Sequence, residues 1–189
     1  MADKQVSILK RDGTQSTFYS TYTSAIADAI SDDVIQIWAD LTEQITLKNG
    51  VDIWIMPGVM LDYNPASPGP TITDNNSPVE CNIYGMGVIK NTRNITSSYY
   101  NTILISSPNS KITIECDQIE NDSNSIVISC ISSNAAKFYL KCNKVFGKRG
   151  GAIFLNNGNS DININVKEVV TGLENDINTG SSALITKGN

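Results

Sequence analysis

Three segments in the second half of the chain alternate apolar and polar residues in the same order. They read "SKITIECDQIE" at 110–120, "AKFYLKCNKVF" at 136–146 and "SDININVKEVV" at 160–170. Alternation with a period of two is typical of a β-strand that buries one face. Equivalent positions recur about every 25 residues, so the three segments are predicted to be strands of one repeated unit.

Aligning these segments predicts four columns of inward-facing side chains. The columns are Ile112, Phe138 and Ile162; Ile114, Leu140 and Ile164; Cys116, Cys142 and Val166; Ile119, Val145 and Val169. A second series lies between them and reads "NTILIS" (101–106), "NSIVIS" (124–129), "GAIFLN" (151–156) and "SALITK" (182–187). We align its members on Ile103, Ile126, Ile153 and Leu184.

A unit of about 25 residues with two or three short strands and polar turns favours a parallel β-helix. No helical pattern separates the strands, and propeller blades need about 40–45 residues per unit. Earlier strand-like runs lie at 34–40, 45–50, 51–61 and 79–89, with a Pro-, Gly- and Asn-rich loop at 63–78 before the last. We expect Ile53, Cys81 and Ile112 to continue one column of the core.

The segment "TYTSAIADAISDD" (21–33) predicts the one helix. Thr21 or Thr23 can cap it, and Ile26, Ala29 and Ile30 form an apolar stripe at helical spacing. We expect this helix to cover the open end of the solenoid. The predicted organisation is an N-terminal strand and capping helix at 1–33, followed by β-helix coils at 34–189 that form one domain.

Residues 21–90 resemble the opening of the pectin-lyase-like superfamily, in which a short helix leads into strands of the type "GDTI-x-I", "ENITL" and "GV-x-L-x-G". The matching text is "SAIADAISDDVIQIWAD", "TEQITLKNGVDIWIMPGVMLDY" and "IYGMGVI". The resemblance implies an all-β fold, a right-handed parallel β-helix with a short N-terminal capping α-helix. One departure is that the family places Gly before Asp in the first turn, where this chain has "SDD" at 31–33. The fold hosts lyases, hydrolases, adhesins and phage tailspikes, so the resemblance specifies function poorly.

Composition narrows the possible partners. Charged residues make up 17% of the chain, against about 25% in average proteins, and the net charge is −5. No cluster of Lys and Arg suited to nucleic acid is present, and no run approaches the roughly 18 apolar residues of a membrane span. The N-terminus lacks the apolar region of a signal peptide. We therefore expect synthesis in a host cytoplasm, with no nucleic-acid or membrane partner.

The chain has no His, and its four cysteines form no C-x-x-C pair. These spacings argue against a zinc site, and no other cofactor is predicted. We interpret Cys81, Cys116, Cys130 and Cys142 as small buried apolar residues, with a disulfide or metal role as the alternative.

Catalytic residues are not evident in the sequence. The resemblance implies two kinds of catalytic site. Polysaccharide lyases on this fold use Ca²⁺-binding carboxylates with an Arg or Lys base, and the hydrolases use a group of Asp residues. The clearest acidic cluster is Asp117, Glu120 and Asp122, but the aligned positions after Asp117 are Asn143 and Lys167. We interpret the cluster as a solvated face, with a calcium or substrate site as the alternative.

Aromatic residues are the candidate ligand contacts. Trp54 lies between Ile53 and Ile55, so its side chain is predicted to point away from the core. Trp54, Tyr99 and Tyr100 are therefore candidates for stacking on sugar rings, whereas partial burial under a loop is the alternative for Trp54.

The functional hypothesis is a structural or receptor-binding component of a phage virion, such as a tail fibre, tailspike or head fibre. We expect a homotrimer that contacts other virion proteins and a cell-surface polysaccharide, located in the virion. The last strand-like run is not followed by a closing helix, so we expect further chain or another subunit to cover that end. The alternative functions are a β-helix polysaccharide lyase or glycoside hydrolase, and a bacterial carbohydrate-binding adhesin.

Overall fold

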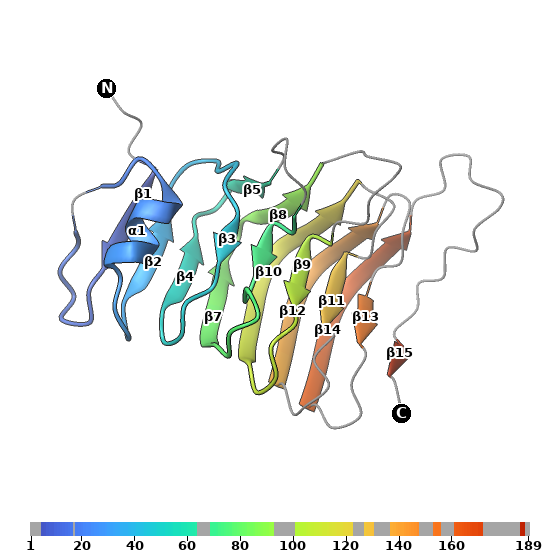
Figure 1. The fold of residues 1–189 in the computed structure, drawn as a ribbon. Coiled ribbons are helices and arrows are strands. Elements are labelled where there is room, and N and C mark those ends of the chain that lie inside the picture. The colour runs from blue at the N-terminus through green and yellow to red at the C-terminus, as the bar shows by residue number, and fades with distance from the viewer. Residues whose placement is uncertain are drawn as a thin grey trace.

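The computed structural model shows a parallel β-solenoid with one short helix (Figure 1). It describes residues 5–16, 18–63, 69–92, 101–122, 127–130, 137–147, 153–155, 161–171 and 186–187. The all-β architecture predicted from the repeat is confirmed.

Two sheets run along the solenoid. The longer sheet contains β1 (Val6–Leu9), β2 (Val34–Ile37), β4 (Asp52–Ile55), β7 (Glu80–Gly85), β10 (Lys111–Asn121), β12 (Lys137–Gly147) and β14 (Asp161–Thr171). β8 (Val88–Asn91) also pairs with β10, and β5 (Met60–Asp62) pairs with β8. The shorter sheet contains β3 (Ile45–Thr46), β6 (Ile72–Thr73), β9 (Ile103–Ile105), β11 (Ile128–Cys130), β13 (Ile153–Leu155) and β15 (Thr186–Lys187). Among the described residues, every strand pair from β2 to β15 is parallel, as stacked coils require.

The four predicted columns of the longer sheet are confirmed by the pairing register. Ile112 pairs with Phe138 and Phe138 with Ile162, and the other three columns follow the same register. Ile114, Leu140 and Val145 are fully buried. Each fully buried Ile, Leu or Val contributes about 1.5–3 kcal/mol by leaving water, so the stacked columns form the main stabilising core.

Some of the predicted registers elsewhere are wrong by one or two residues. Ile103 pairs with Ile128 instead of Ile126, and Phe154 pairs with Thr186 instead of Ile185. Cys81 pairs with Ile112 as predicted, but Ile53 pairs with Ile83. A shift of two residues keeps the same face of a strand inward, so hydrophobic alternation alone does not exclude it.

The predicted loop at 63–78 also contains a strand. Ile72 and Thr73 form β6, and the Ile72 side chain is fully buried against β3 and β9. Two residues are too few for an alternating pattern, which is why the sequence did not indicate the strand.

Strands β10, β12 and β14 each continue through a bend. On β10 the inward positions are 112, 114 and 116 before the bend and 119 and 121 after it, so Asp117 and Gln118 both face outward. One coil earlier the same path is divided into β7 and β8 by Gly85 and Gly87. Gly85 has φ +129°, and a Cβ atom there would lie 1.9 Å from the carbonyl oxygen of Ile55.

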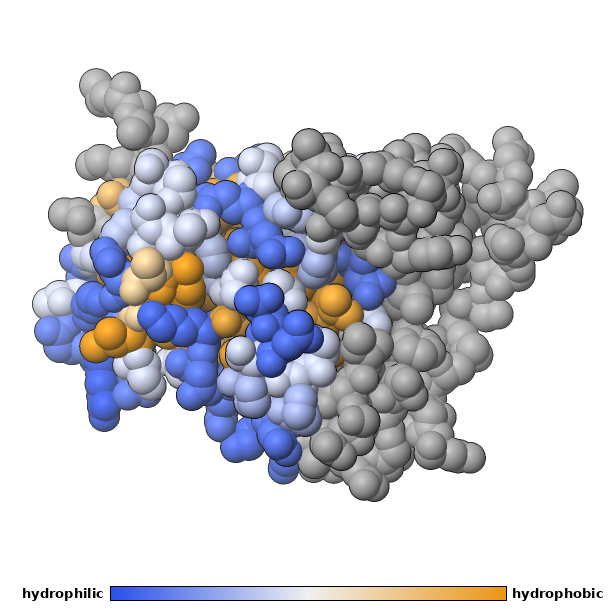
Figure 2. Space-filling view, in the orientation of Figure 1, coloured by the Kyte–Doolittle hydropathy of each residue, from blue (hydrophilic) through white to orange (hydrophobic). Residues whose placement is uncertain are grey.

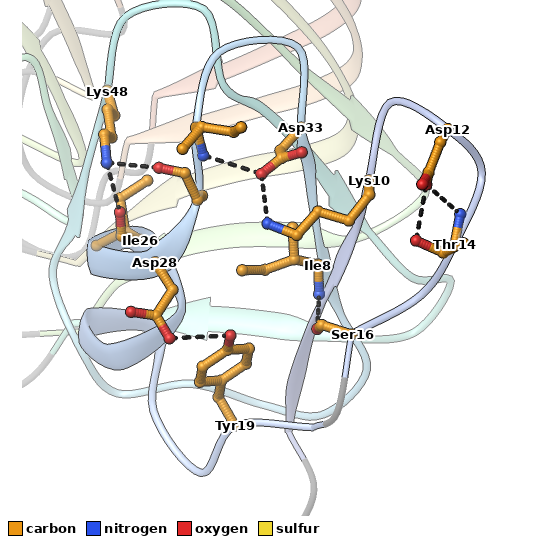
Figure 3. A network of polar contacts seen from close by, with 12 residues as sticks. Ile8, Lys10, Asp12, Thr14, Ser16, Tyr19, Ile26, Asp28, Asp33 and Lys48 are labelled. Atoms are coloured by element: carbon orange, nitrogen blue, oxygen red, sulfur yellow. Dashed lines mark hydrogen bonds and ion pairs between the residues drawn. The ribbon is translucent and has the colours of Figure 1, made fainter.

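The N-terminal end is capped by β1 and by helix α1 (Tyr22–Asp28). β1 pairs antiparallel with β2, so Val6 lies opposite Ile37 and the first coil has a partner on this side. Of the two predicted candidates, Thr21 is the N-cap, and its hydroxyl accepts the Ser24 amide at 3.1 Å. At the other end, Lys48 Nζ donates to the carbonyl oxygens of Ile26 and Ala29 (Figure 3).

The predicted apolar stripe of the helix is partly wrong. The helix buries Tyr22 and Ala25, and Ala29 is buried just past its end. Ile26 is only partly buried, and Ile30 is 65% exposed, because the helix ends at Asp28 and the chain then becomes extended.

The "SDD" turn works without glycine. Asp32 adopts φ +70°, a left-handed conformation that Asp tolerates better than most residues. The Asp33 carboxylate is buried and accepts hydrogen bonds from Lys10 Nζ at 2.8 Å and the Ile30 amide at 2.9 Å (Figure 3). The Asp33 carboxylate, just before β2, therefore connects the residue after β1 and the segment after α1 to the start of the first coil.

Candidate functional site

The outer face of the longer sheet carries the candidate site. Strand β4 buries Ile53 and Ile55. Trp54 lies between them and points outward, as predicted, and its side chain is half-buried. Tyr84 occupies the equivalent outward position on β7, one coil further along. The two rings stack with centroids 6.0 Å apart and planes inclined by 25°.

A column of outward residues continues from this aromatic pair. The register places Tyr84 beside Glu115, Glu115 beside Lys141 and Lys141 beside Asn165. Lys141 Nζ lies 3.1 Å from Glu115 Oε2, and both side chains are about half exposed. Each side chain neutralises the charge of the other. Because both are partly exposed, their hydrogen-bond donors and acceptors remain accessible to a ligand.

A second outward column runs alongside the first. Asn82 Nδ2 donates to both carboxylate oxygens of Asp52 at 3.1 Å, and the Asn82 amide donates to Asp52 Oδ1 at 2.7 Å. The column continues through Thr113, Tyr139 and Asn163. Polar groups therefore flank the aromatic column at regular spacing, because neighbouring parallel strands lie about 4.8 Å apart.

Two shallow grooves cross this face. One has a volume of about 530 Å³, and its lining includes Asn82, Thr113 and Tyr139. The other has a volume of about 470 Å³, and its lining includes Tyr84 and Asn143. Each groove combines an aromatic ring with amide groups, the mixture that small-molecule and sugar sites commonly present.

The Tyr84 phenol is in its protonated form at neutral pH. Partial burial, and secondarily the nearby Asp52 carboxylate, raises the pKa of Tyr84 above its ordinary value of 10.0, which extends the protonated form further into alkaline pH. The phenol can therefore donate a hydrogen bond at the edge of the site.

The other two predicted contacts are Tyr99 and Tyr100. Both lie outside the described residues, so their role stays a prediction. Tyr84 was missed by sequence reasoning. Its signal was its position after inward Ile83 in "CNIYG", but the assumed pairing of Ile53 with Cys81 placed Trp54 opposite Asn82 instead.

The acidic cluster around the bend is held by internal contacts. Lys90 Nζ lies 3.0 Å from Glu120 and 3.8 Å from Asp122. Asp117 accepts a hydrogen bond from Asn143 at 2.7 Å. Across the residues that the structure describes, no group of three or more His, Cys, Asp or Glu side chains is arranged to hold a metal ion.

Three of the four cysteines have described side chains. Cys81, Cys116 and Cys142 are buried and free, as the sequence interpretation predicted, and Cys130 has no described side chain. Within the described part of the chain, no helix is both long and apolar enough to cross a membrane.

No protein-family model, curated protein or solved structure matches this chain.

Proposed function

We propose that this chain is a structural and receptor-binding component of a phage virion, a tail fibre, tailspike or head fibre that binds a host-surface glycan. The observation that supports glycan binding is the stacked Trp54–Tyr84 pair on the outer face, beside the Asp52–Asn82 hydrogen bonds. Sugar rings present apolar C–H faces and hydroxyl edges. A ligand of this kind needs aromatic surface and hydrogen-bonding groups side by side.

The repeat of the sheet favours an extended ligand. Each coil adds an outward residue to every column at the inter-strand spacing of about 4.8 Å. The polar groups of β7, β10 and β12 therefore form a linear series next to the aromatic pair. A polysaccharide, which also repeats along one direction, fits such a series better than a compact metabolite.

The surface charge favours a neutral or weakly charged glycan. Lys111 lies 2.8 Å from Glu80, and Lys141 lies 3.1 Å from Glu115. Both lysines thus face a carboxylate on the neighbouring strand. A strongly anionic polymer would have to compete with these carboxylates for the lysines.

The virion and trimer parts of the proposal depend on the resemblance of the sequence to the pectin-lyase-like superfamily, whose fold also occurs in phage tailspikes. The genomic neighbourhood tests them directly. Capsid and portal genes beside this gene are the expected result, and sugar-uptake genes would contradict it. Sizing of the purified protein should show a trimer.

A glycan array tests the binding function. The folded chain should bind a limited set of bacterial surface polysaccharides, and double substitution of Trp54 and Tyr84 by Ala should abolish the signal. Binding to none of a broad panel would contradict the proposal. New reducing or unsaturated ends on a bound polysaccharide would replace binding with the enzymatic alternative.

A further inference from the structure

Two buried thiols lie on neighbouring coils at the same position of the core. Cys116 on β10 pairs in register with Cys142 on β12, and their Sγ atoms are 3.8 Å apart. Residues paired on adjacent parallel strands have Cα atoms about 4.8 Å apart, which lies within the range that a disulfide spans. The sulfur atoms must close from 3.8 Å to about 2.0 Å to form the bond.

The two thiols are buried and already in contact with each other. Cys116 donates its S–H hydrogen bond to Cys142, and Cys142 Sγ lies 3.0 Å from the carbonyl oxygen of Lys144. The pair lies at the bend, where Asp117 is skipped in the register between β10 and β12.

We propose that Cys116 and Cys142 form a reversible disulfide that cross-links two successive coils of the solenoid. This proposal is independent of glycan binding. The oxidant is a low-molecular-weight disulfide such as glutathione disulfide. One cysteine thiolate attacks it and releases a first glutathione. The second cysteine thiolate then attacks the mixed disulfide, forms the Cys116–Cys142 bond and releases a second glutathione. Two thiols are oxidised, one glutathione disulfide is reduced, and the two thiol protons pass to the released glutathione.

The reaction should be slow in the folded protein. Both thiols are buried, so an oxidant reaches them only when the coil opens locally. The hydrogen bond to Cys142, together with burial, raises the pKa of the Cys116 thiol, whereas the same hydrogen bond lowers the pKa of Cys142, so the first thiolate should form on Cys142. The rate should therefore rise with pH. Once formed, the cross-link closes a loop that contains the segment between β10 and β12. It should raise the unfolding midpoint by roughly 5–10 °C, and dithiothreitol should reverse the rise.

Peptide mapping of the native chain tests the proposal. The folded protein is treated with glutathione disulfide, free thiols are blocked with iodoacetamide, and the chain is digested without reduction. Trypsin combined with a glutamyl endopeptidase is needed, because cleavage after Glu120 separates Cys116 from Cys130. The expected product links the peptide of Cys116 to the peptide of Cys142.

Cys81→Ser is the matched control, because Cys81 is also buried but lies on β7 opposite Ile112. It should retain both the linked peptide and the rise in midpoint, whereas Cys142→Ser should lose both. A linked peptide that involves Cys81 or Cys130 would overturn the proposal. A stable glutathione adduct without the internal link would also overturn it, as would thiols that oxidise in urea but not in the folded chain.

Discussion

Asp74 holds Ser106 from the next coil of the solenoid through both the backbone and the side chain of that serine. The Asp74 carboxylate is fully buried and accepts the Ser106 amide at 3.1 Å and the Ser106 hydroxyl at 2.9 Å. It also accepts the Ser107 amide at 2.7 Å. The carboxylate therefore supplies the hydrogen bonds that a neighbouring strand would otherwise make, at the point where the chain leaves β6 and β9 and turns.

Replacing Asp74 with Ala should destabilise the fold by about 3 kcal/mol or more. The substitution leaves two amides without their acceptor, and hydrogen bonds to a charged group contribute about 1.5–3 kcal/mol each. Urea unfolding followed by circular dichroism measures the loss. Asp12→Ala is the control, because Asp12 is exposed and bonds only within its own turn to Thr14. Equal losses for the two variants would contradict the structural role of Asp74.

Gly85→Ala should be among the most damaging small substitutions in the chain. The added Cβ would lie 1.9 Å from the Ile55 carbonyl oxygen, and the residue has φ +129°. Backbone atoms cannot yield as a flexible side chain can, so the coil must shift. We expect a loss of more than about 3 kcal/mol or failure to fold.

Gly58→Ala is the matched control for this prediction. Gly58 also has a positive φ, +80°, but nothing lies within 4 Å of an added Cβ. Its cost should be limited to the conformational penalty of about 1–2 kcal/mol. Thermal unfolding of the two variants under the same conditions measures the difference. A lower unfolding midpoint for Gly58→Ala than for Gly85→Ala would contradict this prediction.

Alkaline pH should weaken the fold through Cys81. Burial raises the pKa of Cys81 to about 12 from an ordinary value of 9.0. Because the folded pKa is the higher one, this contribution is fully present below pH 9 and is lost as the pH rises toward 12. The loss can reach about 1.4 kcal/mol per pH unit within that window.

Cys81→Ala separates this effect from other groups that ionise at high pH. The variant should be less stable at pH 7 because it leaves a small cavity, by roughly 1 kcal/mol. Between pH 9 and 11, however, it should lose less stability than the parent chain. Urea unfolding at pH 7, 9, 10 and 11 gives both curves, and parallel curves would contradict the assigned role of Cys81.

Sequence reasoning recovered the features that depend on local alternation. The columns through Cys116 and Cys142 were predicted because three long strands carry the same pattern in equal lengths. The outward direction of Trp54 followed from its two inward neighbours. Whether a strand residue points inward or outward depends on its nearest neighbours along the chain, so it can be predicted from the sequence without knowledge of the fold.

The features that were missed depend on contacts between coils. Whether Ile53 pairs with Cys81 or Ile83 is decided by loop length and packing, since both residues face inward. The same two-residue uncertainty hid Tyr84 as the partner of Trp54. Ile30 fits a helical stripe in the sequence, but the turn that Asp33 holds ends the helix before it.

The central functional claim is that the Trp54–Tyr84 pair binds a glycan. Titration calorimetry with the polysaccharide that the array selects tests it most directly, with Phe18→Ala as the control. Phe18 is an exposed aromatic residue whose ring centroid lies 6.2 Å from that of Trp38, the residue after β2, and it is not part of the Trp54–Tyr84 stack. Trp54→Ala and Tyr84→Ala should each weaken binding tenfold or more, roughly 1.4 kcal/mol, while Phe18→Ala leaves it unchanged. Unchanged affinity in folded Trp54→Ala and Tyr84→Ala would contradict the account.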